Sequence, residues 1–339
     1  MKMGRTVAAA LLLAALLAGC ADGNGTAADG GNNGAAGGSG GGTTGGNGSE
    51  IPSVPEVELP PSEGEDIFKG RTFSDGSDQY VFSTDGTFAR MGKGSDFQYM
   101  YSVNRDGELC IKLDKWGMAF GSAVVKWLSF DEMVQYVESG EYFADERASA
   151  LESVKDIEGL PEWMEEHGMT NYKEYVEYVI SQEKSFLDMQ KKYGYPSWRN
   201  EFAYRRYAVE ERDGRFVLTE QYEASSAWFR LRNGSEGING LAVCPGVGIA
   251  GFEPEGVDSE GNGTYFYSYS VSDGKILFVN EKAESMTFPA TYTISGSGND
   301  TTLEMSFEYG GVQYDETLDF DPGTLYLTKV EAAASSPQD

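Results

Sequence analysis

A short phrase recurs along this sequence: a tyrosine, a small residue, a valine, a few polar residues, Asp-Gly and then a new apolar run. It occurs at residues 101–109, 207–216 and 269–276, and residues 80–88 carry a close variant. Asp-Gly between alternating apolar runs is a strong hairpin signal, because both residues tolerate the positive φ of a type I′ turn. The sequence therefore predicts repeated antiparallel hairpins at irregular spacing.

The hairpins belong to a long antiparallel meander. Strands are expected near 79–84, 87–91, 97–104, 108–113, 202–210, 215–222, 226–232, 264–272, 275–280, 287–294, 301–309 and 313–319. A sheet of that length has to curl or close, since open edges invite pairing with other chains. The predicted fold class is mainly β with a helical insert, the meander closing into a barrel or a two-layer sandwich.

Residues 129–194 interrupt the strand pattern with helical periodicity. Ser129 and Glu132 form a capping box, Pro161 opens a short helix that Gly168 ends, and Thr170 precedes the longest apolar stripe. Two interpretations stay open. The helices form a lid or a partner-binding insert over the barrel, or the stripe packs on the sheet and on neighbouring helices.

The start of the chain has the pattern of a secretion signal. Lys2 and Arg5 precede an apolar run at 7–18, which is shorter than the roughly 20 residues a membrane-spanning helix needs. The expected organisation is a signal peptide (1–19), a tether (20–61), a first β-meander segment (62–128), the helical insert (129–194), a second β-meander segment (195–330) and a disordered tail (331–339).

Leu17-Ala18-Gly19-Cys20 resembles the lipobox of bacterial lipoproteins. The resemblance implies that Cys20 carries lipid, becomes the new N-terminus and anchors the protein to a bacterial membrane in the cell envelope. Ala21 follows the cysteine, which in proteobacterial lipoproteins implies the outer membrane or cell surface. Residues 21–50 contain 13 glycines and cannot bury enough surface to fold. Such a tether reaches about 30 Å.

A second resemblance begins at Gly70-Arg71-Thr72-Phe73 and continues through Phe82-Ser83-Thr84-Asp85-Gly86-Thr87-Phe88. These motifs are similar to the opening of lipocalin-like domains found in bacterial lipoproteins. Those domains commonly carry a tryptophan soon after the early glycine, where this chain has Thr72 and Phe73. The resemblance implies a lipocalin-like β-barrel.

Composition excludes several functions. The chain has 54 acidic and 26 basic residues, so it lacks the clustered positive charge that nucleic-acid binding requires. It has one histidine, so a two-histidine metal site cannot form and imidazole catalysis would have to use His167. We therefore expect no nucleic-acid partner. We also expect no cofactor, no metal and no enzymatic activity, with a carboxylate-dependent hydrolase as the alternative.

Two cysteines remain besides Cys20. Leu109, Ile111 and Leu113 share one face of their expected strand, which places Cys110 on the other face. An extracytoplasmic compartment permits a disulfide between Cys110 and Cys244. Two reduced thiols are the alternative, and the one we favour.

The leading functional hypothesis is a membrane-anchored, non-catalytic binding module for a small hydrophobic ligand. Its speculative ligand-binding residues, otherwise core residues, are Trp116, Trp127, Trp198 and Trp228. The acidic net charge predicts that neutral or cationic hydrophobic ligands bind better than anionic ones. The alternatives are a surface interaction or adhesion protein that uses its outer face, and an envelope hydrolase that uses paired carboxylates.

Overall fold

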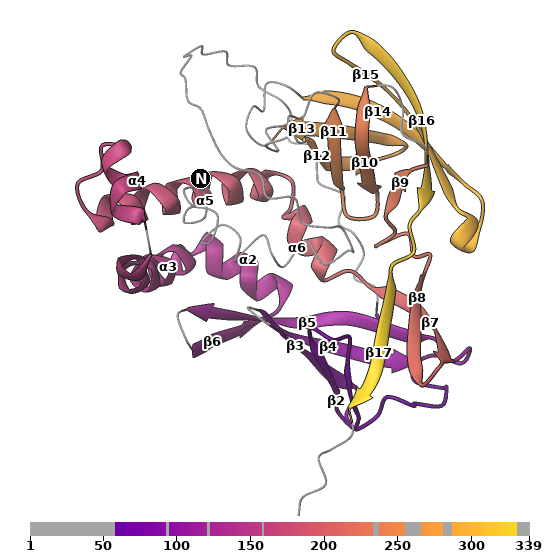
Figure 1. The fold of residues 1–339 in the computed structure, drawn as a ribbon. Helices are drawn as coiled ribbons and strands as arrows, with labels where there is room; N and C mark the ends of the chain where they lie inside the picture. The colour runs from indigo at the N-terminus through magenta and orange to yellow at the C-terminus, as the bar shows by residue number, and fades with distance from the viewer. Residues whose placement is uncertain are drawn as a thin grey trace, which may run out of the picture.

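The computed structural model describes residues 58–92, 95–120, 123–157, 159–232, 237–254, 266–280 and 287–330. They form two closed eight-stranded antiparallel β-barrels and a group of helices (Figure 1). The predicted fold class is confirmed, with closed barrels rather than a sandwich. Cys20 and the glycine-rich segment 21–50 lie outside the described residues. Within the described part of the chain, no helix is long and apolar enough to cross a membrane.

The first barrel takes its strands from three separate parts of the chain. They are β1 (Thr72–Ser74), β2 (Gln79–Phe82), β3 (Thr87–Gly92), β4 (Ser95–Val103), β5 (Leu109–Phe120), β7 (Arg205–Arg212), β8 (Arg215–Gln221) and β17 (Thr324–Val330). The ring closes where β4 pairs with β5 and where β1 pairs with the C-terminal strand β17. A further strand, β6 (Ala123–Leu128), pairs with β5 and extends the sheet beyond the ring.

The second barrel is inserted between β8 and β17. Its strands are β9 (Phe229–Leu231), β10 (Ile238–Cys244), β11 (Ile249–Pro254), β12 (Phe266–Ser272), β13 (Lys275–Asn280), β14 (Phe288–Ser295), β15 (Thr302–Tyr309) and β16 (Val312–Phe320), with the short helix η4 (Gly298–Asp300) between β14 and β15. This ring closes by pairing β16 with β9. The strand segment expected at 195–330 therefore contributes to both barrels.

Of the four Asp-Gly pairs in the recurring phrase, two form the tight turns that the sequence predicts. Asp213-Gly214 and Asp273-Gly274 have positive φ at both residues, as a type I′ turn requires. The type I′ prediction is wrong for Asp85-Gly86 and Asp106-Gly107, where only the glycine has positive φ. These turns are wider, and side chains hold them: Asp85 Oδ1 accepts the Thr87 N–H at 3.1 Å.

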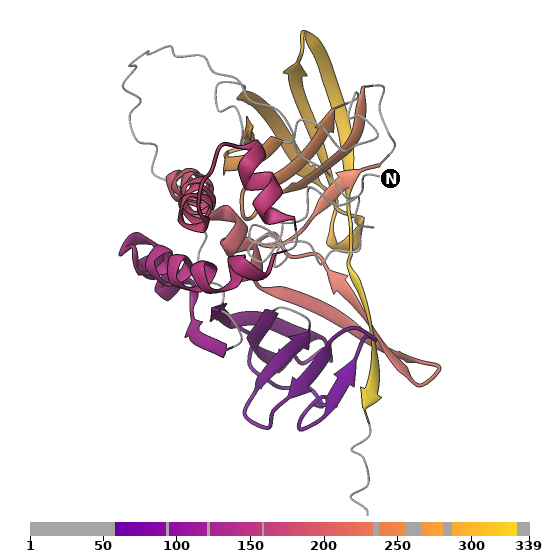
Figure 2. The same cartoon turned by 60° about the vertical axis from the view of Figure 1, so that its left-hand side comes forward.

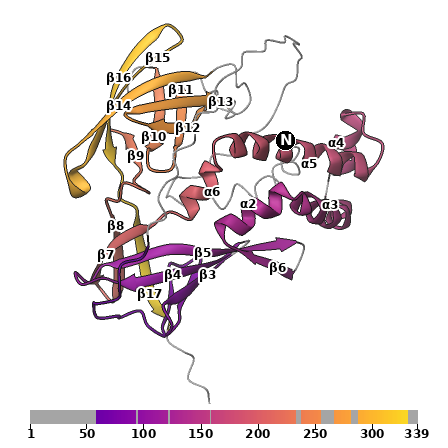
Figure 3. The same ribbon diagram turned by 180° about the vertical axis from the view of Figure 1, so that it is seen from behind.

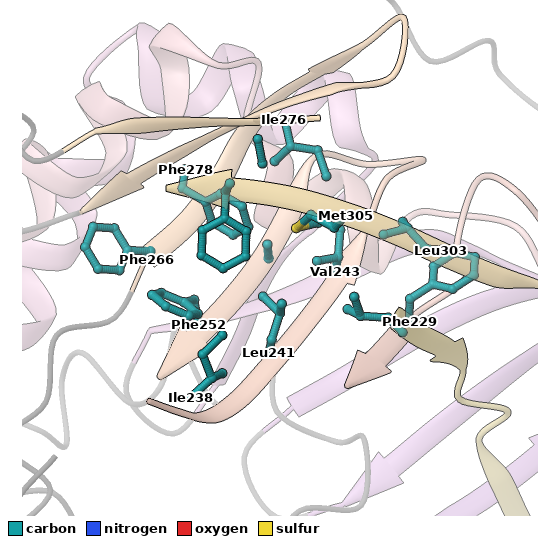
Figure 4. Packing of buried hydrophobic residues seen from close by; sticks show 14 of the residues in the cluster. Phe229, Ile238, Leu241, Val243, Phe252, Phe266, Ile276, Phe278, Leu303 and Met305 are labelled. Carbon is teal, nitrogen blue, oxygen red and sulfur yellow. The ribbon is translucent and has the colours of Figure 1, made fainter. Parts of the chain in front are cut away.

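Aromatic rings fill the interior of the second barrel (Figure 4). Phe252 is fully buried. Its ring centroid lies 5.6 Å from those of Phe266 and Phe307 and 5.5 Å from that of Tyr309. Side chains packed this closely leave a core rather than a lumen.

The helical insert connects β6 to β7. Its elements are α2 (Phe130–Glu138), α3 (Glu141–Ser153), η2 (Val154–Asp156), α4 (Leu160–Glu166), α5 (Tyr172–Lys192) and α6 (Pro196–Glu201). The predicted capping box of Ser129 and Glu132 is present, and Gly168 follows α4 with φ of 69°. His167 is the C-terminal cap of α4 and is exposed.

The apolar faces of the helices are buried against the first barrel and against one another. Met133 and Trp198 pack with Phe97 and Trp116 of the barrel strands. The stripe of α5 packs with α3 and α4, where Tyr175 is fully buried. The views from the side and from behind show the helices beside the junction of the two barrels (Figures 2 and 3). The stripe is thus used for packing.

Candidate binding site at the mouth of the first barrel

One end of the first barrel is closed by aromatic rings. Phe68, in the segment before β1, is fully buried, and its ring centroid lies 4.9 Å from that of Phe82 and 5.5 Å from that of Phe73. Asp66 fixes this segment, because its Oδ1 accepts the Phe68 N–H at 3.0 Å and its Oδ2 accepts the Tyr101 hydroxyl at 3.0 Å. The packed rings form a floor to the barrel.

The opposite end, which we call the mouth, is lined by polar side chains. In β7, Arg205 and Tyr207 share the inward face with Val209, since alternate residues of a strand point to the same side, and Tyr207 and Val209 pack on the barrel core. Glu220 of β8 is paired opposite Tyr207. With the facing strands β2, β3 and β4 included, the mouth residues are Tyr80, Arg90, Tyr99, Arg205, Tyr207 and Glu220.

Arg205 carries a charge inside the mouth and remains partly accessible to solvent. Burial lowers the pKa of its guanidinium, but Tyr207, Glu220 and other neighbours outweigh burial and hold that pKa above its usual value. Its Nη2 donates to the Asn200 carbonyl oxygen at 3.4 Å. Among the described residues, no carboxylate lies within ion-pair distance of it. Since a guanidinium has five N–H donors, part of its donor capacity is open.

Burial shifts the pKa values of the neighbouring groups toward their neutral forms. Burial raises the pKa of Tyr99 to about 12, although Arg90 opposes this shift. Burial and Glu220 raise the pKa of Tyr207, although Arg205 opposes it. Burial also raises the pKa of Glu220 against the effect of Arg205. The mouth therefore offers phenolic O–H donors beside a guanidinium.

The positive charge of Arg90, the other arginine of the mouth, is paired with a carboxylate. Arg90 Nε lies 2.6 Å from Asp78 Oδ2, and its guanidinium carbon lies 5.9 Å from the centroid of the Tyr80 ring. The Tyr80 hydroxyl donates to Asp75 Oδ2 at 2.8 Å. The two sides of the mouth thus differ, because within the described ranges Arg90 has a carboxylate as ion-pair partner and Arg205 has none.

The second barrel and the insert lie close to the mouth. Burial raises the pKa of the Cys244 thiol, at the end of β10, to about 12, and the charges of Arg205 and Glu220 both reach it. The buried Gln190 of α5 donates to the Tyr269 hydroxyl of β12 at 3.0 Å, and Tyr193 stacks on the Tyr269 ring at 5.0 Å. These contacts join the insert to the second barrel.

The structure does not gather the four tryptophans proposed from the sequence into one site. Trp116 and Trp198 are buried in the same cluster between the first barrel and the helices. Trp127 lies on β6 and is 40% exposed. Trp228 lies in the connection just before β9 and is partly buried. Two of them pack in a core, and the other two lie apart from it.

Cys110 and Cys244 are both buried free thiols. Cys110 belongs to β5 of the first barrel, and its Sγ lies 3.8 Å from the Glu108 carbonyl oxygen. Cys244 belongs to β10 of the second barrel. Burial raises the pKa of each thiol, which disfavours the reactive thiolate.

The charged residues of the mouth were not predicted from the sequence, although the strand register contains a signal for them. Arg205 shares the inward register with Tyr207 and Val209, and Glu220 shares it with Leu218. A charged residue in an otherwise apolar inward register is unusual for a packed strand. That pattern, rather than the tryptophans, would have indicated the mouth.

Two surface hollows lie away from the mouth. One, of about 340 Å³, lies over β14, β15 and β16 and includes Glu304, Ser306 and Asp315. The other, of about 610 Å³, lies where α4 meets α5 and includes Pro161 and Met169. Among the residues that the structure describes, no group of three or more histidine, cysteine or acidic side chains is arranged to hold a metal ion.

Comparisons of the chain with models of known families, with curated proteins and with solved structures found no match.

Proposed function

We propose that this protein is a membrane-anchored extracytoplasmic binding protein without catalytic activity, and that its ligand enters the mouth of the first, lipocalin-like barrel. The observation that carries the proposal is the position of Arg205 and Tyr207, which point into the barrel and remain partly accessible. A ligand site typically combines a mainly apolar wall with a few placed polar groups. The mouth has this composition.

The wall around these polar groups is aromatic. The Tyr99 ring stacks on Phe88 with centroids 4.6 Å apart and an interplanar angle of 10°. Phe97 and Leu113 adjoin the mouth from the cluster beneath the helices. Because the floor of the barrel is packed, the expected ligand is small and partly hydrophobic.

The envelope location is part of the same proposal and depends on Cys20. Lipid on this cysteine would hold the barrels near a membrane surface at the end of the glycine-rich tether. Mass spectrometry of the mature protein should find a diacylglyceryl group on Cys20 and no residues 1–19. Cys20→Ser should release the protein from the membrane fraction, and a mutant that stays bound there to the wild-type extent would contradict the anchor.

A second candidate function is recognition of a partner by the outer face of the second barrel. The packed core of this barrel favours it, since a barrel filled by Phe252 and its neighbours offers an outer surface rather than a lumen. The hollow over β14 to β16 is bordered by polar side chains, and Ser306 Oγ donates to Asp315 Oδ1 at 2.7 Å. A partner bound there would meet side chains that can form hydrogen bonds.

One pair of tryptophan substitutions separates the two candidates. Tyr99→Trp adds volume at the mouth, and Thr293→Trp adds a similar side chain at the outer hollow. A neutral solvatochromic probe such as Nile red should bind the full-length protein saturably. Binding should be lost in Tyr99→Trp and kept in Thr293→Trp, with thermal melting of both variants measured to verify folding. The absence of saturable binding to the wild type, or its loss only in Thr293→Trp, would overturn the mouth as the site.

A further inference from the structure

We infer that Arg205 is the receptor for an anionic, carboxylate-type group of the ligand, an inference that rests on the proposed function of the mouth. The recognised group would accept hydrogen bonds from the guanidinium and from the Tyr207 hydroxyl. A guanidinium presents parallel N–H donors that match the two oxygens of a carboxylate. The ligand class is therefore a small organic acid with an apolar body.

The comparison with the other arginines carries this inference. Within the described chain, carboxylates pair with the guanidinium groups of Arg90, Arg147, Arg206, Arg212, Arg230 and Arg232. The partly buried Arg199 has a strong acceptor instead, the Gly194 carbonyl oxygen at 2.6 Å, and its guanidinium covers the Phe130 ring. Arg205 bonds the Asn200 carbonyl oxygen at 3.4 Å and the Tyr207 hydroxyl, and no carboxylate among the described residues lies within ion-pair distance of it. Arg71, Arg105 and Arg215 also lack a carboxylate pair within the part of the chain that the structure describes, but they are exposed to water. An inward guanidinium with open N–H donors and no carboxylate partner is suited to an acceptor from outside.

The nearby acids leave this role open to a ligand. Glu220 and Glu201 act on Arg205 through their charges, yet both lie beyond ion-pair distance of it. A Cβ placed on Gly323 would lie 3.0 Å from Glu220 Oε2, so the carboxylate is turned toward the start of β17. The Gly323 backbone N–H stabilises its charged form. Glu220 is therefore held by another strand rather than by the guanidinium.

Local charge should outweigh the net charge of the chain at this position. The formal net charge of −28 repels anions at long range, but salt screens exposed charges beyond about 8 Å. Arg205 is only partly accessible to water inside the mouth, and a hydrogen bond to a charged group is stronger where less water surrounds it. This reverses the preference for neutral or cationic ligands that the net charge alone predicts.

The test uses three probes of one shape and different charge: benzoate, benzamide and benzylamine. Each is titrated into the full-length protein, with binding followed by saturation-transfer NMR and calorimetry at low and at high salt. Benzoate should bind about tenfold or more tightly than benzamide, because the charge-assisted hydrogen bonds exist only for the acid. Benzylamine should bind most weakly.

Matched variants assign the effect to one side chain. Arg205→Gln should abolish the preference for benzoate, and Tyr207→Phe, which removes only a hydroxyl, should reduce it. Arg206→Gln is the control, because Arg206 is the next residue and pairs on the outer face with Glu108 and Glu223. It should keep the preference.

The outcomes separate the inference from the proposed function. If benzamide binds as tightly as benzoate, or if Arg206→Gln and Arg205→Gln have equal effects, the role of Arg205 is wrong while binding at the mouth stands. If none of the three probes binds saturably to a folded wild type, binding at the mouth fails and the inference fails with it. Unchanged preference in a folded Arg205→Gln variant also overturns the inference.

Discussion

Arg205 and Arg206 are neighbours in the sequence and have opposite environments. Arg206 is held on the outer face by Glu108 at 3.0 Å and Glu223 at 2.9 Å, whereas Arg205 points into the mouth. Composition cannot distinguish them, because both are arginines and they are adjacent in the same stretch. Strand register can, since it assigns one to each face. The site was therefore partly readable from alternation, but the lack of an ion-pair partner required the folded structure.

A prediction at the scale of a single residue concerns Phe68 in the floor of the first barrel. Phe68→Ala should lower the free energy of unfolding by about 3 to 5 kcal/mol, because it leaves a cavity among rings that cannot collapse fully. Urea denaturation followed by circular dichroism measures the change. Met100→Ala is the control, since Met100 lies on the same barrel and is 45% exposed. Equal effects of the two substitutions would mean that Phe68 does not close the barrel.

The helices were predictable as elements because their signals are local. A capping box, Pro161 and a regular apolar stripe need only neighbouring residues to be recognised. Several strands were missed for the opposite reason. β6 (Ala123–Leu128) is apolar except for Lys126, and β10 and β11 flank the glycine-rich turn at 245–248, so none of them shows clean alternation. Their pairing partners, not their own sequences, make them strands.

The interface between α3 and α5 contains a buried carboxylate, from which we predict how the stability of the protein depends on pH. Glu183 is 7% exposed and accepts a hydrogen bond from the Tyr142 hydroxyl. Burial raises the pKa of Glu183 to about 7, with Glu146 adding to the shift and the Tyr142 bond opposing it. The pKa of Glu183 is higher in the folded protein than in the unfolded chain. Its contribution to the free energy of unfolding is therefore fully present below about pH 4.5 and is lost as pH rises through about 7.

Glu183→Gln should remove this dependence, because the amide stays neutral. The variant should be more stable than the wild type at pH 8 by about 3 kcal/mol, with the difference vanishing below pH 4.5. Thermal melting of both proteins across this pH range measures it. Asp188→Asn, at an exposed position of the same helix, should give no comparable gain. A constant difference between wild type and Glu183→Gln at all pH values would contradict the ionisation argument.

At the scale of the whole molecule, the unexpected feature is the route of the chain. The sequence predicts that a long meander must close, but it does not indicate which strands meet. β1 pairs with β17, so Ser74 lies opposite Thr328, with the insert and the whole second barrel between them in sequence. Pairing over that distance has no local signature. The first barrel cannot close until the last strand has been made.

This route predicts that the two barrels depend unequally on the C-terminus. Truncation after Asp321 removes β17, exposes the edges of β1 and β8 and deletes the fully buried Leu327. The second barrel keeps all its strands, 229–320. We expect the first barrel to unfold and the second to remain folded. Opening the barrel edges and losing a core strand should cost more free energy than the free energy of unfolding of a marginally stable domain.

The tryptophans make this measurable, because residues 229–339 contain none. Tryptophan fluorescence therefore reports on the first barrel, the insert and the connection at Trp228, while hydrogen exchange of β10 to β16 reports on the second barrel. The truncated chain should show solvent-exposed tryptophan emission together with retained amide protection in β13 to β16. Truncation after Val330, which removes only 331–339, should leave both signals as in the full chain. If truncation after Asp321 also leaves tryptophan emission unchanged, the first barrel closes without β17, and the strand that returns from the second barrel is dispensable to it.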